Sequence, residues 1–221
     1  MSASVSEPAV RALLGEAAEW RLLGLLFERP REGWHESVAE LAPEVADPLL
    51  QDAAAAALEE ATEGMYHAVL GPSGGVSVRE AGYSKSIQTG AQIADLKAFY
   101  DAFAYAPVTD EPPDHLSVEA GFLGFLKLKQ AFAEMEGEPE HVSLTKEAAR
   151  EFLESHMALC AQPLVVALGD TAPVYMQLAA AALAARSPEA PPQPHSPFTE
   201  MMEGCELSCG LGDPAAEETP A

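Results

Sequence analysis

The chain has 221 residues, enough for one domain with a sizeable core or for two small lobes. It carries 12 Lys and Arg against 35 Asp and Glu, and this net charge of −23 repels nucleic acid and anionic membranes. We therefore expect no nucleic-acid partner, and an attraction to basic peptides, basic protein surfaces or metal ions. Solubility alone, or adaptation to salt, is the simpler explanation of the acidity.

The amino terminus and the apolar runs bear on where the protein works. The first ten residues, MSASVSEPAV, lack the basic start and apolar core of a signal peptide. No apolar run reaches the roughly 18 residues that a membrane span needs. These features predict a cytoplasmic protein with no membrane span.

The first third of the chain has a helical pattern. Pro8 suits a first helical turn, and apolar residues follow at helical spacing until Pro30. Asp47-Pro48 predicts an N-cap followed by proline at the first helical position. The helix that they open is alanine-rich, and we expect it to run to about Leu70.

Residues 71–90, GPSGGVSVREAGYSKSIQTG, have no sustained periodicity and predict a long loop. Loops of this length are usually functional or mobile. A phosphate-binding P-loop would need Gly-Lys-Ser/Thr to close the glycine stretch, but Val76 and Ser77 follow it here. Nucleotide binding by this loop is therefore not expected.

Helical spacing resumes in the rest of the chain. Apolar and aromatic residues at i, i+3, i+4 and i+7 predict a helix around Leu96 to Phe103, and a proline break follows. A further helix is expected to about Met135, another from Ser143, and a last one to near Arg186. No strand alternation appears, so we predict an all-α fold in two helical blocks, at about 7–105 and 114–186.

Residues 187–221 form a Pro-rich acidic tail that we predict to be disordered, which leaves residues 1–186 as the folded domain. The tail contains Cys205 and Cys209, a Cys-x₃-Cys pair, with His195 as the one nearby third ligand candidate. Two thiolates at this spacing can share a soft metal or form a redox pair, although metal sites normally have four ligands. A chance pair is the simpler interpretation, and a metal-handling or redox accessory protein is the alternative function.

The segment EPPDHLSVEAGFL, residues 111–123, precedes a predicted helix and poses the main functional question. Asp114 and His115 could form a catalytic pair, but adjacent residues rarely hold the geometry that such a pair needs. Asp114 is well placed as a helix N-cap, and Glu119 is close enough to favour the helix dipole. Capping leaves His115 unexplained. Of the other candidate residues, His156 and Cys160 lie on an apolar face and are expected in the core.

Four stretches, in order, resemble the TorD/DmsD/NarJ family of molybdoenzyme chaperones. The strongest is EPPDHLSVEAGFL, which is similar to the family signature Glu-x-Pro-Asp-His-Leu-x-x-Glu-Leu-x-Phe, although Ala120 and Gly121 replace its usual Leu-Glu. Three weaker stretches also match: EWRLLGLLFERP, YHAVLGPSGGVSVREAGY and EFLESHMALCAQPL. Together they cover roughly residues 10–186.

The resemblance implies a helical bundle of the TorD-like type, a monomer or homodimer, that is not an enzyme and carries no cofactor of its own. It implies binding of the precursor of a molybdenum-cofactor oxidoreductase, at its twin-arginine signal or N-terminal segment, until cofactor insertion is complete. Such a peptide needs carboxylates beside an apolar groove, because carboxylates bind guanidinium groups bidentately. The expected client-binding residues are Glu111, Pro113, Asp114, His115, Glu119 and Tyr83.

Overall fold

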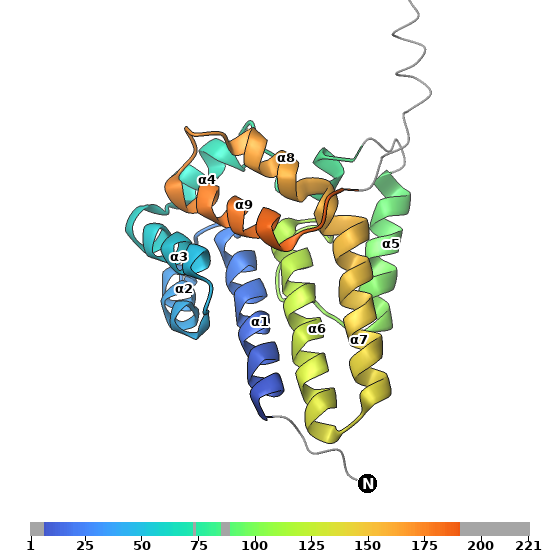
Figure 1. The fold of residues 1–221 in the computed structure, drawn as a ribbon. Coiled ribbons are helices and arrows are strands. Elements are labelled where there is room, and N and C mark those ends of the chain that lie inside the picture. The colour runs from blue at the N-terminus through green and yellow to red at the C-terminus, as the bar shows by residue number, and fades with distance from the viewer. Residues whose placement is uncertain (1–6, 73, 85–88, 191–221) are drawn as a thin grey trace, which may run out of the picture.

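A computed structural model describes residues 7–72, 74–84 and 89–190, and within these ranges it contains helices and no strand. The long helices α1 (Glu7–Leu26), α6 (Leu116–Glu136), α7 (Pro139–Phe152) and α5 (Thr89–Ala102) stand side by side (Figure 1). The shorter α8 (Ala158–Leu168) and α9 (Val174–Arg186) lie across one end of them. The predicted all-α class is confirmed.

Helices α1 and α6 are the central pair, and two glycines let them approach closely. A Cβ on Gly24 would lie 3.1 Å from the carbonyl oxygen of Ser117, and a Cβ on Gly124 would lie 3.1 Å from that of Ala17. Any larger residue would force the helices apart. The core therefore runs without interruption between the two predicted helical blocks, since α1 belongs to the first and α6 to the second.

An aromatic cluster joins α5 and α7 to α6. The Phe122 ring is buried at its centre, 4.8 Å from the ring of Phe152 and 5.0 Å from that of Tyr100. Most of these contacts are edge-to-face, the geometry that aromatic quadrupoles favour. The cluster fixes the position of α6, whose first residues belong to the functional site.

Helices α2 (Trp34–Leu41), α3 (Pro48–Glu60) and α4 (Glu63–Val69) complete the first block. Asp47 caps α3 as predicted, accepting the backbone N–H of Leu50 at 3.0 Å. The expectation of one helix as far as Leu70 is wrong, because Thr62 caps a separate α4 through the N–H of Met65. Thr62 is extended, and this breaks the helix without proline or glycine.

Two other predicted boundaries also differ. Helix α7 begins at Pro139 rather than at Ser143, since proline suits a first helical position. The predicted loop 71–90 contains a short 3₁₀ turn, Glu80–Gly82, and α5 already begins at Thr89. Beyond α7, a π-helical segment, Leu153–Met157, leads directly into α8. The predicted limit of the folded domain at residue 186 stays a prediction, because residues 191–221 are outside the described ranges.

Candidate functional site

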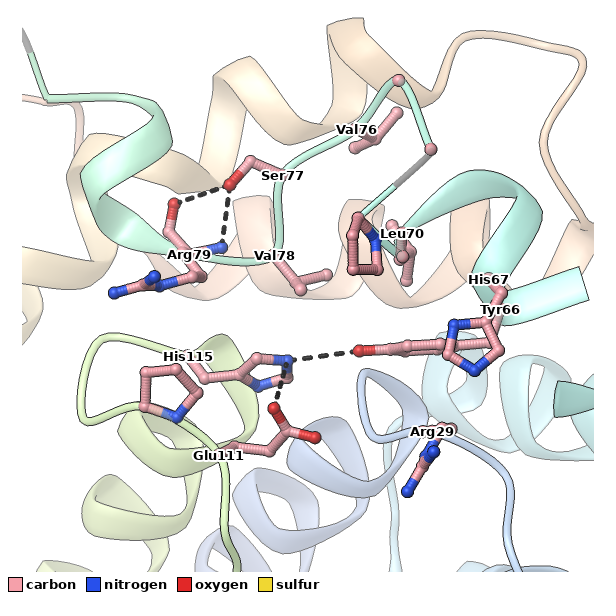
Figure 2. A pocket seen from close by; sticks show the side chains of 15 residues that line it. Arg29, Tyr66, His67, Leu70, Val76, Ser77, Val78, Arg79, Glu111 and His115 are labelled. Carbon is pink, nitrogen blue, oxygen red and sulfur yellow. Dashed lines mark hydrogen bonds and ion pairs between the residues drawn. The ribbon is translucent and has the colours of Figure 1, made fainter.

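A pocket of about 730 Å³ lies where the loop after α4 meets the start of α6 (Figure 2). One wall comes from α4 and the loop that follows it, residues 71–72 and 74–79, and the other from Glu111, Pro112 and His115. The lining residues are Arg29, Tyr66, His67, Leu70, Gly71, Pro72, Gly74, Gly75, Val76, Ser77, Val78, Arg79, Glu111, Pro112 and His115. We call this cavity the Glu111 pocket.

The glycine-rich wall is shaped by its close fit to α4. A Cβ on Gly74 would lie only 2.2 Å from the carbonyl oxygen of Val69, which no side chain could tolerate. The backbone N–H of Val76 then donates to that same carbonyl at 3.1 Å. Gly74 therefore serves a tight backbone turn against α4.

His115, and not the predicted Asp114, is the N-cap of α6. Its Nδ1 accepts the backbone N–H of Ser117 at 3.2 Å, and only 2% of the residue is exposed. Burial lowers the pKa of His115 below its usual 6.5, while the nearby Glu111 carboxylate opposes this shift. The neutral ring then carries its proton on Nε2, which faces the Tyr66 hydroxyl at 3.3 Å and the Glu111 carboxylate at 3.9 Å (Figure 2).

Asp114 binds the loop instead of capping the helix. Its Oδ1 accepts two hydrogen bonds from the Arg79 guanidinium, from Nε at 2.9 Å and from Nη2 at 2.7 Å. Two backbone bonds flank this pair, from Glu80 N–H to the Asp114 carbonyl and from Leu116 N–H to the Val78 carbonyl, both at 2.9 Å. Because the carboxylate is fully buried and already paired, it fixes one wall of the Glu111 pocket to the start of α6.

Glu119 lies in the first turn of α6, as expected, but it faces the core. It is fully buried, and neither carboxyl oxygen has a hydrogen-bond partner among the described residues. Burial, with the charges of Glu80 and Asp114, raises the pKa of Glu119 well above its usual 4.5. Glu119 is thus a buried acid whose protonated form is favoured, not a surface carboxylate.

The match to known proteins decides the family. The family model of the nitrate reductase delta subunit matches residues 31–164, more than half of the chain. The chain belongs to this family. No curated protein and no solved structure matches the chain.

Membership of this NarJ/TorD-like chaperone family confirms the resemblance seen in the sequence. It implies a role in the assembly of a molybdoenzyme, and it suggests a chaperone rather than a catalyst. Within the described ranges, no helix is long and apolar enough to cross a membrane. The same part of the chain contains no group of three or more His, Cys, Asp or Glu that could hold a metal ion.

In this family member, the six predicted site residues do not form one surface. Glu111 and His115 line the Glu111 pocket, and Glu111 is the one whose side chain is partly exposed, at 30%. Pro113 lies outside the lining, where its carbonyl accepts the Tyr100 hydroxyl at 2.8 Å. Asp114 and Glu119 were expected to offer their carboxylates to the client, but both are fully buried.

Tyr83 is a structural residue of the loop. Its hydroxyl donates to the Ser77 carbonyl at 2.6 Å, and its ring packs against the core. His156 and Cys160 are buried as predicted, and His156 Nδ1 lies 3.1 Å from the Glu80 carboxylate. Cys205, Cys209 and His195 lie outside the described residues.

Sequence reasoning missed three residues that line the Glu111 pocket: Arg29, Tyr66 and Arg79. Arg29 forms an ion pair with Glu63 at 3.2 Å. The pair joins the segment after α1 to the first residue of α4, beside the pocket. Arg79 carried a usable signal, because it is the first basic residue after a long stretch without Lys or Arg. Tyr66 and Arg29 lie within two of the stretches that resemble the family, but their position beside the pocket depends on the fold.

Proposed function

We propose that this family member is a chaperone for one molybdenum-cofactor oxidoreductase. It holds the N-terminal segment of the catalytic-subunit precursor in the Glu111 pocket while the cofactor is inserted, before export or membrane docking. The residues proposed to contact the client are Glu111 and His115. Asp114, Pro113 and Tyr83 hold the loop and the start of α6 in place beside them, and Glu119 lies in the core.

One observation supports this proposal: the two arginines in the pocket lining, Arg29 and Arg79, are already paired with Glu63 and Asp114, whereas the Glu111 carboxylate has no Lys or Arg partner among the described residues. Leu70, Val76 and Val78 offer apolar surface on one side, and on the other the Glu111 carboxylate has, in the described part of the chain, no closer partner than His115 Nε2 at 3.9 Å. A peptide that combines arginine with apolar residues matches this pattern, because a carboxylate accepts two guanidinium hydrogen bonds. The net charge of −23 adds long-range attraction for such a peptide.

The first experiment is a pull-down of the tagged chain from its own host grown under respiratory conditions, with co-purifying proteins identified by mass spectrometry. The proposal expects the cofactor-free precursor of a molybdenum enzyme. A precursor that carries a twin-arginine leader would assign this chaperone to the export route. Recovery of no molybdenum enzyme at all would overturn the client assignment.

The pocket is then tested by titrating the N-terminal peptide of the recovered precursor in a calorimeter. We expect Glu111→Gln to weaken binding about five- to tenfold, the effect of losing one partly exposed charge-assisted contact. Glu59→Gln, an exposed site on α3 that removes the same charge, is the matched control and should bind normally.

A double-mutant cycle distinguishes a direct contact between Glu111 and a peptide arginine from a general effect of the lost charge. On a peptide whose arginines are replaced by glutamine, the effect of Glu111→Gln should disappear. An equal loss on both peptides would show that Glu111 does not meet the arginine, and would remove it from the proposed contact.

A further inference from the structure

The C-terminal half of α6 has an exposed apolar face. Phe132 is 63% exposed, Met135 50% and Leu128 39%, and their i, i+4, i+7 spacing puts them on one side of the helix. Leu144 of α7, 58% exposed, lines the same groove as Phe132. Single exposed apolar residues are common, but a contiguous set of this kind marks an interaction surface.

The course of α5 explains why this face is open. Toward the start of α6, Phe99 of α5 packs on Phe122 of α6 and on Phe152 of α7, so α5 covers these two helices there. Helix α5 ends at Ala102, and Ala104 adopts a left-handed conformation with φ of 54° that turns the chain away. The uncovered groove, about 340 Å³, begins at this point, with Ala102 and Phe103 among its lining.

The rim of the groove is acidic. Four glutamates, Glu134, Glu136, Glu138 and Glu140, fall within seven residues around the α6–α7 turn, and residues 130–145 contain no Lys or Arg. Glu138 is engaged with His141 at 2.6 Å, while Glu136 has no ion pair among the described residues. Lys129 is the one lysine in the lining, and it lies 5.2 Å from the Phe125 ring.

We propose that the α6–α7 groove is a docking surface for a basic amphipathic helix of a partner protein. A helix laid between α6 and α7 would extend the layer that α5 begins, and its apolar face would cover Phe132 and Leu144. Basic residues on its flank would meet Glu136 and Glu138. The site is separate from the Glu111 pocket, since the 17 residues of α6 from Leu116 to Phe132 span about 25 Å.

Charge favours a basic partner over two other possible occupants, the acidic tail of this chain and a second copy of the chain. Residues 187–221 carry seven Asp and Glu and no Lys or Arg, so the tail is repelled by the acidic rim. A second copy would bring another such rim and another net charge of −23 to the same contact. A basic partner meets neither penalty.

The test uses the full chain and a labelled 18-residue helical peptide built from leucine, alanine and lysine, with leucines on one face. Fluorescence anisotropy should show binding that the double variant Phe132→Ser/Leu144→Ser weakens at least tenfold. Glu136→Gln/Glu138→Gln should weaken it about fivefold. Both variants change exposed side chains, so the fold should be retained, and circular dichroism checks this.

Three controls make the result specific to the groove. Val166→Ser, an 81% exposed apolar residue on α8, should bind the peptide normally, as should Glu111→Gln. A peptide with glutamate in place of lysine should not bind. Because the peptide is not a client, failure here leaves the proposed pocket intact, and failure of the pocket leaves this groove intact.

The proposal is overturned if the Phe132→Ser/Leu144→Ser variant binds as well as the native chain, since the attraction would then be only a general effect of net charge. It is also overturned if sedimentation equilibrium shows a dimer that the same variant dissociates. The groove would then be occupied by a second copy.

Discussion

Glu119 shows most clearly how one residue links pH to stability. It is a fully buried carboxyl without a hydrogen-bond partner in the described part of the chain, and burial is the main cause of its raised pKa. Folding therefore makes the acid bind its proton more tightly than it does in the unfolded chain. Between the unfolded pKa near 4.5 and the higher folded pKa, the native state keeps a proton that the unfolded state releases.

The sign of the effect follows from this difference in bound protons. Stability due to Glu119 is greatest at acid pH and falls as the pH rises above 4.5, by at most about 1.4 kcal/mol per pH unit. We expect Glu119→Gln to remove this slope and to be more stable than the native chain at pH 8. Urea unfolding followed by tryptophan fluorescence at pH 5.5, 7 and 8.5 measures it. Glu136→Gln, exposed on the same helix, is the control, and an unchanged slope in Glu119→Gln would contradict the assignment.

At the scale of elements, the sequence predicted most helices because their signals are local. The periodicity around α1, α5 and α6 and the Asp47-Pro48 start of α3 lie within one or two turns of chain. The cap of α6 was missed because the choice between Asp114 and His115 depends on Arg79, 35 residues earlier. The Glu111 pocket was half predicted for the same reason: residues 111–115 carry a motif, while Arg29 and Tyr66 arrive through tertiary packing.

The Arg79–Asp114 pair joins the loop after α4 to α6, and its two ends differ in burial. Asp114 is fully buried, whereas the Arg79 side chain is 46% exposed. Removing the arginine leaves the buried Asp114 carboxylate without its charge partner, which lowers the free energy of unfolding by about 3–5 kcal/mol. Removing the Asp114 charge leaves Arg79 able to turn to solvent, and this lowers the free energy of unfolding by only about 1–3 kcal/mol.

We therefore expect Arg79→Gln to destabilise the chain more than Asp114→Asn does, as measured by urea unfolding at pH 7. Arg150→Gln breaks only exposed pairs on α7, with Glu147 and Glu154, and should cost less than about 1 kcal/mol. If Asp114→Asn is as costly as Arg79→Gln, the pair alone does not set the cost, and the hydrogen bond that Asp114 Oδ2 accepts from the Ala81 N–H at 3.4 Å contributes to it.

At the scale of the whole molecule, the net charge of −23 acts in opposite directions on folding and on binding. The folded chain concentrates like charges that the unfolded chain spreads apart, so repulsion destabilises it. The same field attracts a basic client over a distance that salt shortens, from a Debye length of about 30 Å at 0.01 M to about 10 Å at 0.1 M.

Raising NaCl from 0.01 to 0.1 M should therefore stabilise the fold and weaken the client complex in the same protein. We expect the free energy of unfolding to rise by about 1 kcal/mol, and the association rate of a basic client peptide to fall about tenfold. Urea unfolding and stopped-flow fluorescence measure the two effects, and KCl should give the same result if screening is the cause. A fold that loses stability with salt would mean that its ion pairs, such as those of Arg186 with Glu19 and Asp47, outweigh the general repulsion. An association rate indifferent to salt would mean that apolar contact alone brings the client to the chaperone, and that the acidity serves solubility.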